Sequence, residues 1–200
     1  MKELSQRKFF VKREFRITES KLYYNYSKFG NSTEVDIPFE NIEGSKTSHR
    51  VSHNIILAVS AVFYLIAVAV YYSYSNGGNG ERFAWLFWGV IATVVLGSYF
   101  LTRDSFWRIR LSNNSQIYLH KNIPNLSVTT KFIEEIIDAR NTYLIEQYSF
   151  VDKNLDYDKQ LNNLRWLRSI DVINKEEFEI KYAQLRNSIN PNQSGIGYSN

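Results

Sequence analysis

Two long stretches without a charged side chain constrain the fold of this chain more than any other feature. They cover residues 55–72 and 83–101, and the short polar segment 75–82 separates them. At ~1.5 Å per residue, a helix over the second stretch is roughly 28 Å long, close to the ~30 Å hydrocarbon core of a bilayer. We therefore predict a hairpin of two transmembrane helices over residues 54–101, with the helices at about 54–74 and 83–101.

Aromatic residues at the loop side of both stretches support this interpretation. Tyr71 and Tyr72 close the first stretch, and Trp85 and Trp88 open the second, as in the aromatic belt of a membrane interface. The alternative is a soluble protein with two buried helices. Such helices usually keep some polar face, whereas the polar residues inside these stretches are few and uncharged.

Small residues recur every four positions on the second predicted span, at Gly89, Thr93 and Gly97. Small side chains let two membrane helices approach closely, so that van der Waals contact replaces the missing hydrophobic drive. We expect this stripe to pack against Ala58 and Ala61 of the same hairpin. The alternative is a seam between two copies of the chain.

Basic residues near the predicted spans indicate the orientation. Five flank the two ends of the hairpin, Lys46, Arg50, Arg103, Arg108 and Arg110, whereas the loop carries only Arg82. The positive-inside rule then predicts that both termini are cytoplasmic. The five residues also form a candidate basic surface facing the membrane, although we favour the simpler interpretation that they only set the topology.

Composition excludes several classes of protein. The 200 residues include no cysteine, which excludes disulfides and thiolate metal sites. The formal net charge is only +4, and the chain has no run of like charges, so no nucleic-acid partner is expected. The charged segment 2–16 lacks the apolar core of a signal peptide, and we expect no cleaved leader.

Short stretches of alternating polar and apolar residues flank the hairpin and predict strands. Before it, strands are expected at about 9–17, 22–26, 34–39 and 42–48, with turns at 18–20 and 28–31. After it, strands are expected at about 106–111, 117–119 and 126–129, with a turn at Asn113-Asn114. Thr130 is then expected to cap a helix that ends near Gln147.

Neither flanking segment has enough strands to close a sheet alone, and the charge argument puts both on one side of the membrane. We therefore predict an α+β membrane protein in which residues 1–53 and 102–147 form one cytoplasmic domain, split by the hairpin. This order resembles a bacterial pleckstrin-homology-like (PH-like) domain. Residues 35–42, Val-Asp-Ile-Pro-Phe-Glu-Asn-Ile, are similar to its third strand and following segment, and residues 132–144 to its closing helix.

The two predicted spans, together with the resemblance to a bacterial PH-like domain, predict a protein of the bacterial inner (cell) membrane. The resemblance does not imply a specific lipid. Relatives that bind phosphoinositides use several basic residues around the first hairpin. Here the turn expected at Thr18–Lys21 offers one basic and one acidic residue. The lipid bilayer itself remains an expected partner.

A second resemblance covers residues 158–189, which follow a polar linker and are predicted to form a helical hairpin. Asn174 and Glu177 have the spacing of a capping box. The segment resembles a SHOCT-type short C-terminal domain through Leu164, Leu167, Val172, Ile173, Glu176, Glu177, Phe178, Lys181 and Leu185. Asp171 stands where that family has a turn glycine, and Asn174 where it has a capping threonine. Residues 190–200 are predicted to be a disordered tail by composition.

The helical hairpin is the predicted partner-binding element. Its apolar residues exceed what a segment of this size can bury internally, so we expect it to dock on another surface. The candidate residues are Leu164, Leu167, Phe178, Tyr182 and Leu185. The SHOCT resemblance implies oligomerisation or docking, so the expected partner is a second copy of the chain or another protein.

No catalytic arrangement is recognisable. The three histidines have no further ligand spaced to them, no glycine-rich loop precedes a lysine, and the spans lack the ionisable residue that a transporter needs. We expect no enzyme activity, cofactor or metal. The sequence favours a membrane-anchored interaction or scaffold protein; the alternative is an immunity or regulatory membrane protein that neutralises or controls a partner.

Overall fold

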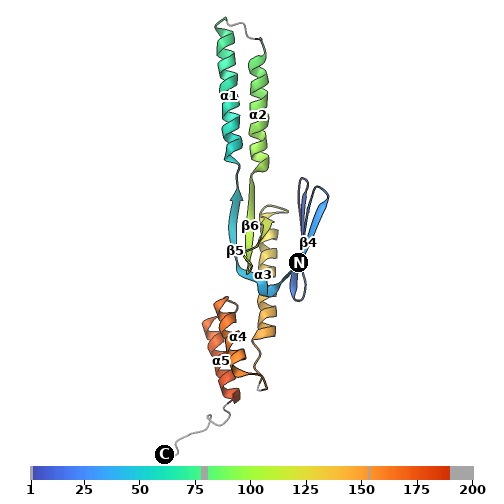
Figure 1. The fold of residues 1–200 in the computed structure, drawn as a ribbon, viewed down its shortest axis with the longest axis vertical. Helices are drawn as coiled ribbons and strands as arrows, with labels where there is room; N and C mark the ends of the chain where they lie inside the picture. The colour runs from blue at the N-terminus through green and yellow to red at the C-terminus, as the bar shows by residue number, and fades with distance from the viewer. Residues whose placement is uncertain (1, 78–80, 153, 190–200) are drawn as a thin grey trace, which may run out of the picture. The chain divides into compact units, whose positions relative to one another are not determined.

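The computed structural model describes residues 2–77, 81–152 and 154–189, and it divides into two compact units. The first combines residues 1–47 with residues 107–200, and the second covers residues 48–106. Within the described ranges the chain has five α-helices and two β-sheets (Figure 1). The mixed α+β class predicted from the sequence is confirmed.

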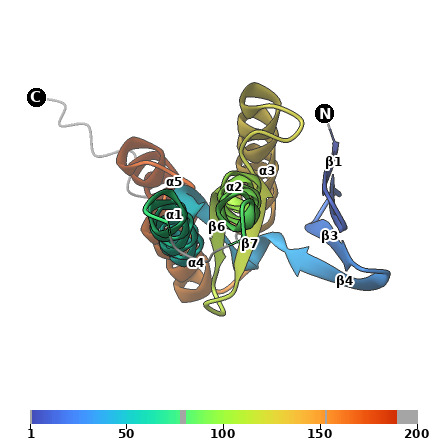
Figure 2. The ribbon, with the colours of Figure 1, turned by 90° about the horizontal axis from the view of Figure 1, so that it is seen from above.

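The first unit contains an antiparallel sheet in the order β1-β2-β3-β4, seen end-on in Figure 2. The strands are β1 (Glu3–Lys8), β2 (Val11–Ile17), β3 (Lys21–Lys28) and β4 (Asn31–Pro38). Pairing of Lys8 with Val11 and of Lys28 with Asn31 leaves two-residue turns at one end of this sheet. The prediction of a strand over 9–17 was wrong at its start, because Phe9 and Phe10 form the turn between β1 and β2.

The missed strand β1 carries a polar residue on its inner face. Leu4 and Gln6 are both buried. The Gln6 side chain accepts a hydrogen bond from the His120 amide at 2.8 Å and donates to the His120 carbonyl at 2.9 Å. It also donates to the carbonyl of Ile123 and, at 3.3 Å, to Thr129 Oγ1. Gln6 therefore joins the segment before the two apolar helices to the segment after them.

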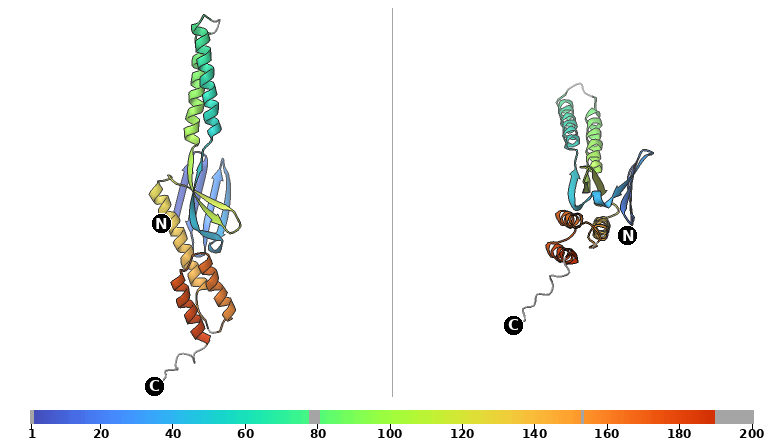
Figure 3. Two further views of the ribbon diagram at one scale, coloured as in Figure 1. Left: turned by 90° about the vertical axis from the view of Figure 1, so that its left-hand side faces the viewer. Right: turned by 60° about the horizontal axis from the view of Figure 1, so that its bottom comes forward.

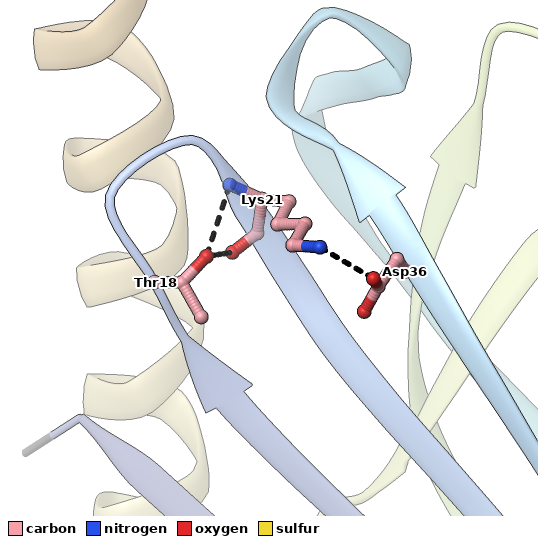
Figure 4. A network of polar contacts seen from close by, with 3 residues as sticks. All are labelled: Thr18, Lys21 and Asp36. Carbon is pink, nitrogen blue, oxygen red and sulfur yellow. Dashed lines mark hydrogen bonds and ion pairs between the residues drawn. The ribbon is translucent and has the colours of Figure 1, made fainter.

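The turn between β2 and β3 lies at the opposite end of the four-stranded sheet. Thr18 Oγ1 donates to the Lys21 carbonyl at 2.6 Å and accepts from the Lys21 amide at 3.3 Å. The Lys21 ammonium pairs with Asp36 of β4 at 2.5 Å (Figure 4). Because these groups are exposed, their contribution to stability is small, about 0–1 kcal/mol.

The second sheet has the order β5-β6-β7. Its strands are β5 (Ile42–Val51), β6 (Asp104–Leu111) and β7 (Gln116–His120), and the short 3-10 helix η1 (Phe39–Asn41) precedes β5. The turn predicted at Asn113-Asn114 is confirmed: Asn114 has a φ of 64°, a conformation that asparagine tolerates.

Helix α3 (Leu126–Tyr148) starts earlier than predicted. Asn125 caps it, accepting from the Val128 amide at 2.8 Å. The strand expected at 126–129 and the cap expected at Thr130 were therefore wrong. Thr129 is buried and donates to the Ile123 carbonyl at 3.0 Å. The asparagine cap and the tertiary hydrogen bond from Gln6 to Thr129 override the strand propensity of Val128 and Thr129.

The main core of the first unit draws on both sequence segments. Phe15 and Leu22 come from the four-stranded sheet, Ile109 from β6, and Phe132 and Ile136 from α3, and all are buried together. Phe15 and Phe132 lie with ring centroids 6.3 Å apart. The segments on either side of the two apolar helices thus bury one another.

Helices α4 (Tyr157–Ser169) and α5 (Lys175–Ile189) form the predicted helical hairpin, which lies beside the C-terminal end of α3 (Figure 3). The capping box is confirmed: the Glu177 amide donates to Asn174 Oδ1 at 2.9 Å, and the Asn174 amide donates to Glu177 Oε2 at 2.8 Å. Asp171 takes a left-handed φ of 56° at the turn. The tail predicted over 190–200 lies outside the described residues.

The second unit contains the two apolar helices, α1 (Asn54–Ser75) and α2 (Ala84–Thr102). Both are long and apolar enough to cross a membrane, and only 6% of the most apolar window of each is buried. Ser60 of α1 is buried against α2 and donates to the Ala92 carbonyl at 2.9 Å. The two-helix prediction is supported at this level.

Candidate binding surfaces

The apolar residues predicted to bind a partner through the C-terminal hairpin are largely covered within the chain. Leu164, Leu167, Phe178 and Leu185 are buried, and Tyr182 is half-buried. They pack on one another and on Leu144 and its neighbours at the end of α3. The hairpin therefore docks on α3, which supplies the cover that its apolar residues were expected to need. A role in partner binding stays a prediction.

The small-residue stripe on α2 does not make the close approach expected inside the hairpin. A Cβ added to Gly89 or Gly97 would meet nothing within 4 Å. Thr93 Oγ1 donates to the Gly89 carbonyl at 2.8 Å and lies 3.0 Å from the Tyr64 hydroxyl. The buried contact between the helices lies instead at Ser60 and Ala92, and the close packing expected of the glycines on Ala58 and Ala61 is not seen.

The five basic residues near the spans fall into two groups. Lys46 pairs with Glu134 of α3 at 2.9 Å and lies 5.5 Å from the Trp107 ring centroid. Arg108 Nε donates to Thr47 Oγ1 at 3.0 Å. The other three, Arg50, Arg103 and Arg110, are exposed. Lys46 and Arg108 thus have structural contacts besides any effect on topology.

A surface that the sequence did not predict lies at the end of the four-stranded sheet where β1 joins β2 and β3 joins β4. Phe9, Phe10 and Phe29 are 61%, 69% and 70% exposed. Phe10 and Phe29 stack with ring centroids 5.1 Å apart, across the two neighbouring turns. We call these three residues the aromatic tip. Contiguous exposed apolar patches often mark interaction sites, whereas single exposed apolar residues are common and need no explanation.

The backbone of the aromatic tip takes a left-handed conformation that is strained for phenylalanine. Phe9 and Phe29 have φ values of 51° and 50°, where bulky side chains are rare and glycine or asparagine is usual. Each such residue costs of the order of 1–3 kcal/mol. Hairpin stability does not explain two phenylalanines in these positions. Their presence therefore favours a functional role for their side chains.

The surroundings of the aromatic tip are basic. Residues 6–13 and 26–33 contain no aspartate or glutamate and five basic residues, Arg7, Lys8, Lys12, Arg13 and Lys28. The ammonium groups of Lys8 and Lys28 lie 5.6 and 5.9 Å from the ring centroids of Phe9 and Phe29. Lys12 pairs with Glu14 at 2.6 Å. The tip therefore combines exposed aromatic rings with excess positive charge.

Sequence reasoning missed this surface because it counted Phe9 as the first residue of a strand. The stretch Arg-Lys-Phe-Phe-Val-Lys-Arg has no glycine, proline or asparagine to mark a turn. A signal was nevertheless present, since two adjacent phenylalanines between basic pairs do not fit the alternation of a half-buried strand.

Comparison with protein-family models, with curated protein sequences and with solved structures finds no match to this chain.

Proposed function

We propose that this chain is a membrane-anchored interaction protein whose PH-like cytoplasmic unit makes a second contact with the bilayer through its aromatic tip. The two apolar helices are the anchor, and the C-terminal helices are the docking or oligomerisation element of a scaffold. The aromatic tip is the observation that carries this proposal. The four-plus-three arrangement of strands and the packing of α3 into their core support a PH-like unit.

Anionic lipid is the partner that fits the composition of the aromatic tip. A basic residue near an anionic membrane surface contributes about 1 kcal/mol, and burying a phenylalanine contributes about 1.5–3 kcal/mol. The unit that carries the tip is joined to the apolar helices by short connections. Two residues separate β5 from α1, and one separates α2 from β6, so a tethered contact needs little intrinsic affinity.

The lipid contact predicts a specific fluorescence result. Because the chain has no cysteine, an environment-sensitive dye can be attached at Asn31→Cys beside the tip. We expect lipids with a doxyl quencher near the headgroup to quench this dye in nanodiscs that contain phosphatidylglycerol, and much less in phosphatidylcholine alone. The matched control is Ser20→Cys, an exposed site at the opposite end of the same sheet, which should stay unquenched.

The paired change Phe9→Asn and Phe29→Asn then separates lipid contact from folding. Asparagine tolerates positive φ, so the hairpins should be at least as stable as before, as judged by thermal unfolding. Quenching at Asn31→Cys should nevertheless fall to the level of the control. If quenching persists in this variant, or is equal at both label sites, the aromatic tip is not a membrane contact.

The proposed topology puts the soluble unit in the cytoplasm, and maleimide labelling tests it. Single cysteines at Ser20, Asn79 and Ser194 are treated with an impermeant maleimide in whole cells. Because basic residues flank the hairpin ends, we expect labelling at Asn79 only, with the other two labelled after permeabilisation. Labelling of Ser20 or Ser194 in intact cells, with Asn79 protected, would show the opposite orientation.

A further inference from the structure

A cavity of about 460 Å³ opens in the first unit between β5, α3 and the turn that joins α4 to α5. Its walls include Gly44, Arg140, Asn141, Trp166 and Asp171. The volume lies within the range of small-molecule sites, roughly 300–1,000 Å³. The cavity does not involve the aromatic tip or the membrane helices.

The unusual group in this cavity is the guanidinium of Arg140. The residue is only 2% exposed, yet among the described residues the guanidinium makes one hydrogen bond, from Nη1 to Asn141 Oδ1 at 2.8 Å. Its Nε is buried and meets no acceptor in that part of the chain. An arginine stays charged in proteins and has five N–H donors, so a buried positive charge is left largely without acceptors.

The carboxylates around Arg140 do not neutralise it. Burial lowers the pKa of Arg140, and the negative charge of Glu43 only partly opposes this effect. No ion pair to Arg140 lies within 4.0 Å among the described residues. Glu40 instead accepts hydrogen bonds from the hydroxyls of Tyr143 and Tyr148 at 3.1 and 3.2 Å. The hydrogen bond to Glu40 raises the pKa of Tyr143, and burial, followed by the charge of Glu40, raises the pKa of Tyr148.

The opposite wall leaves space for the guanidinium. Gly44 of β5 has no side chain, and a Cβ built there would lie 3.0 Å from Arg140 Nη1 and 3.8 Å from its Cζ. An alanine there would require the guanidinium to shift by a few tenths of an ångström. The absence of a side chain at Gly44 therefore lets Arg140 hold its present position at the cavity wall.

We propose that this cavity binds a small zwitterion of the free amino acid class, with its carboxylate on Arg140. A carboxylate matches the fork of a guanidinium and forms strong charge-assisted hydrogen bonds. Glu43 and Asp171 line the same cavity, so they repel a multiply charged anion and attract the ammonium group of the ligand. Trp166 supplies an aromatic wall beside them, which suits an alkyl chain or a cation.

Binding is measured on the full chain in detergent micelles by the NMR signal of the Arg140 side-chain Nε–H. The probes are a panel of the common L-amino acids, sodium acetate as the anion alone, inorganic phosphate, and ethylammonium as the cation alone. We expect a saturable shift of the Arg140 signal with at least one amino acid, at a concentration at least tenfold below that needed with acetate or phosphate. Ethylammonium should have no comparable effect.

Variants test whether the cavity itself is responsible. Arg140→Lys keeps the charge but loses the fork, and Gly44→Ala crowds the guanidinium from the opposite strand. Binding, measured as the thermal stabilisation that the amino acid gives, should weaken at least tenfold in each variant. Gly44→Ala remains informative if Arg140→Lys does not fold. Arg165→Lys, an exposed change on α4, is the matched control and should bind normally.

Three results would overturn the proposal. If no amino acid binds more tightly than acetate or phosphate, the cavity is a general anion site. An Arg140 signal that no amino acid shifts shows that the cavity is not a binding site for this class. Normal binding by a folded Gly44→Ala variant places the ligand elsewhere.

Discussion

Replacing Phe132 with alanine will lower the free energy of unfolding of the first unit by about 3–5 kcal/mol, the usual effect of removing a buried aromatic ring. Phe132 of α3 is 0% exposed and belongs to the core that α3 forms with strands of both sheets, with Phe15 among its neighbours. Its contacts join residues from before and after the two apolar helices. Hydrogen exchange of the full chain, read by mass spectrometry, measures the change separately in each segment.

The distribution of lost protection tests whether the split domain is one cooperative unit. Amides in β1–β4 and in α3 should lose protection together, because the two segments share one core. Phe150→Ala, the same chemical change at a 53% exposed position, should alter protection by less than about 0.5 kcal/mol. If Phe132→Ala loosens residues 107–148 and leaves β1–β4 unchanged, the two segments fold independently.

Regular patterns and local turn chemistry made much of the fold predictable. The apolar spans, the strands from β3 to β7, the turn at Asn114 and the capping box at Asn174 all follow from local sequence. Where the sequence argument failed, a non-local contact decides. Gln6 points inward on β1 because its amide bonds to the far end of β7, a partner that no local pattern reveals.

Predictions about surfaces were weaker because non-local contacts also decide which residues are covered. The apolar residues of the C-terminal hairpin were correctly recognised as needing a cover, but only the structure shows that the end of α3 supplies it. Arg140 did not stand out in the sequence, since nothing in its neighbourhood in the sequence places Gly44 or Trp166 beside it. The aromatic tip was hidden because phenylalanine is unusual in a left-handed turn.

The second large effect is expected at Leu185, which is 0% exposed on α5. Leu185→Ala should lower the stability of the C-terminal hairpin by about 2–5 kcal/mol, because Leu185 belongs to the cluster that joins α4, α5 and the end of α3. So small a hairpin has little other core. Hydrogen exchange should show α4 and α5 losing protection while β1–β4 keep theirs.

An exposed position on the same helix separates stability from partner binding. Ile180 is 59% exposed, so Ile180→Ala should leave hydrogen exchange unchanged. If the outer face of α5 binds a second copy or another protein, Ile180→Asp should reduce crosslinked multimers or co-purifying proteins without loosening α5. A different result would assign partner binding to the buried residues. If Leu185→Ala, alone or with Phe178→Ala, removes multimers while α4 and α5 keep full protection, the buried cluster opens to bind its partner. The docked hairpin is then a closed form of the binding element.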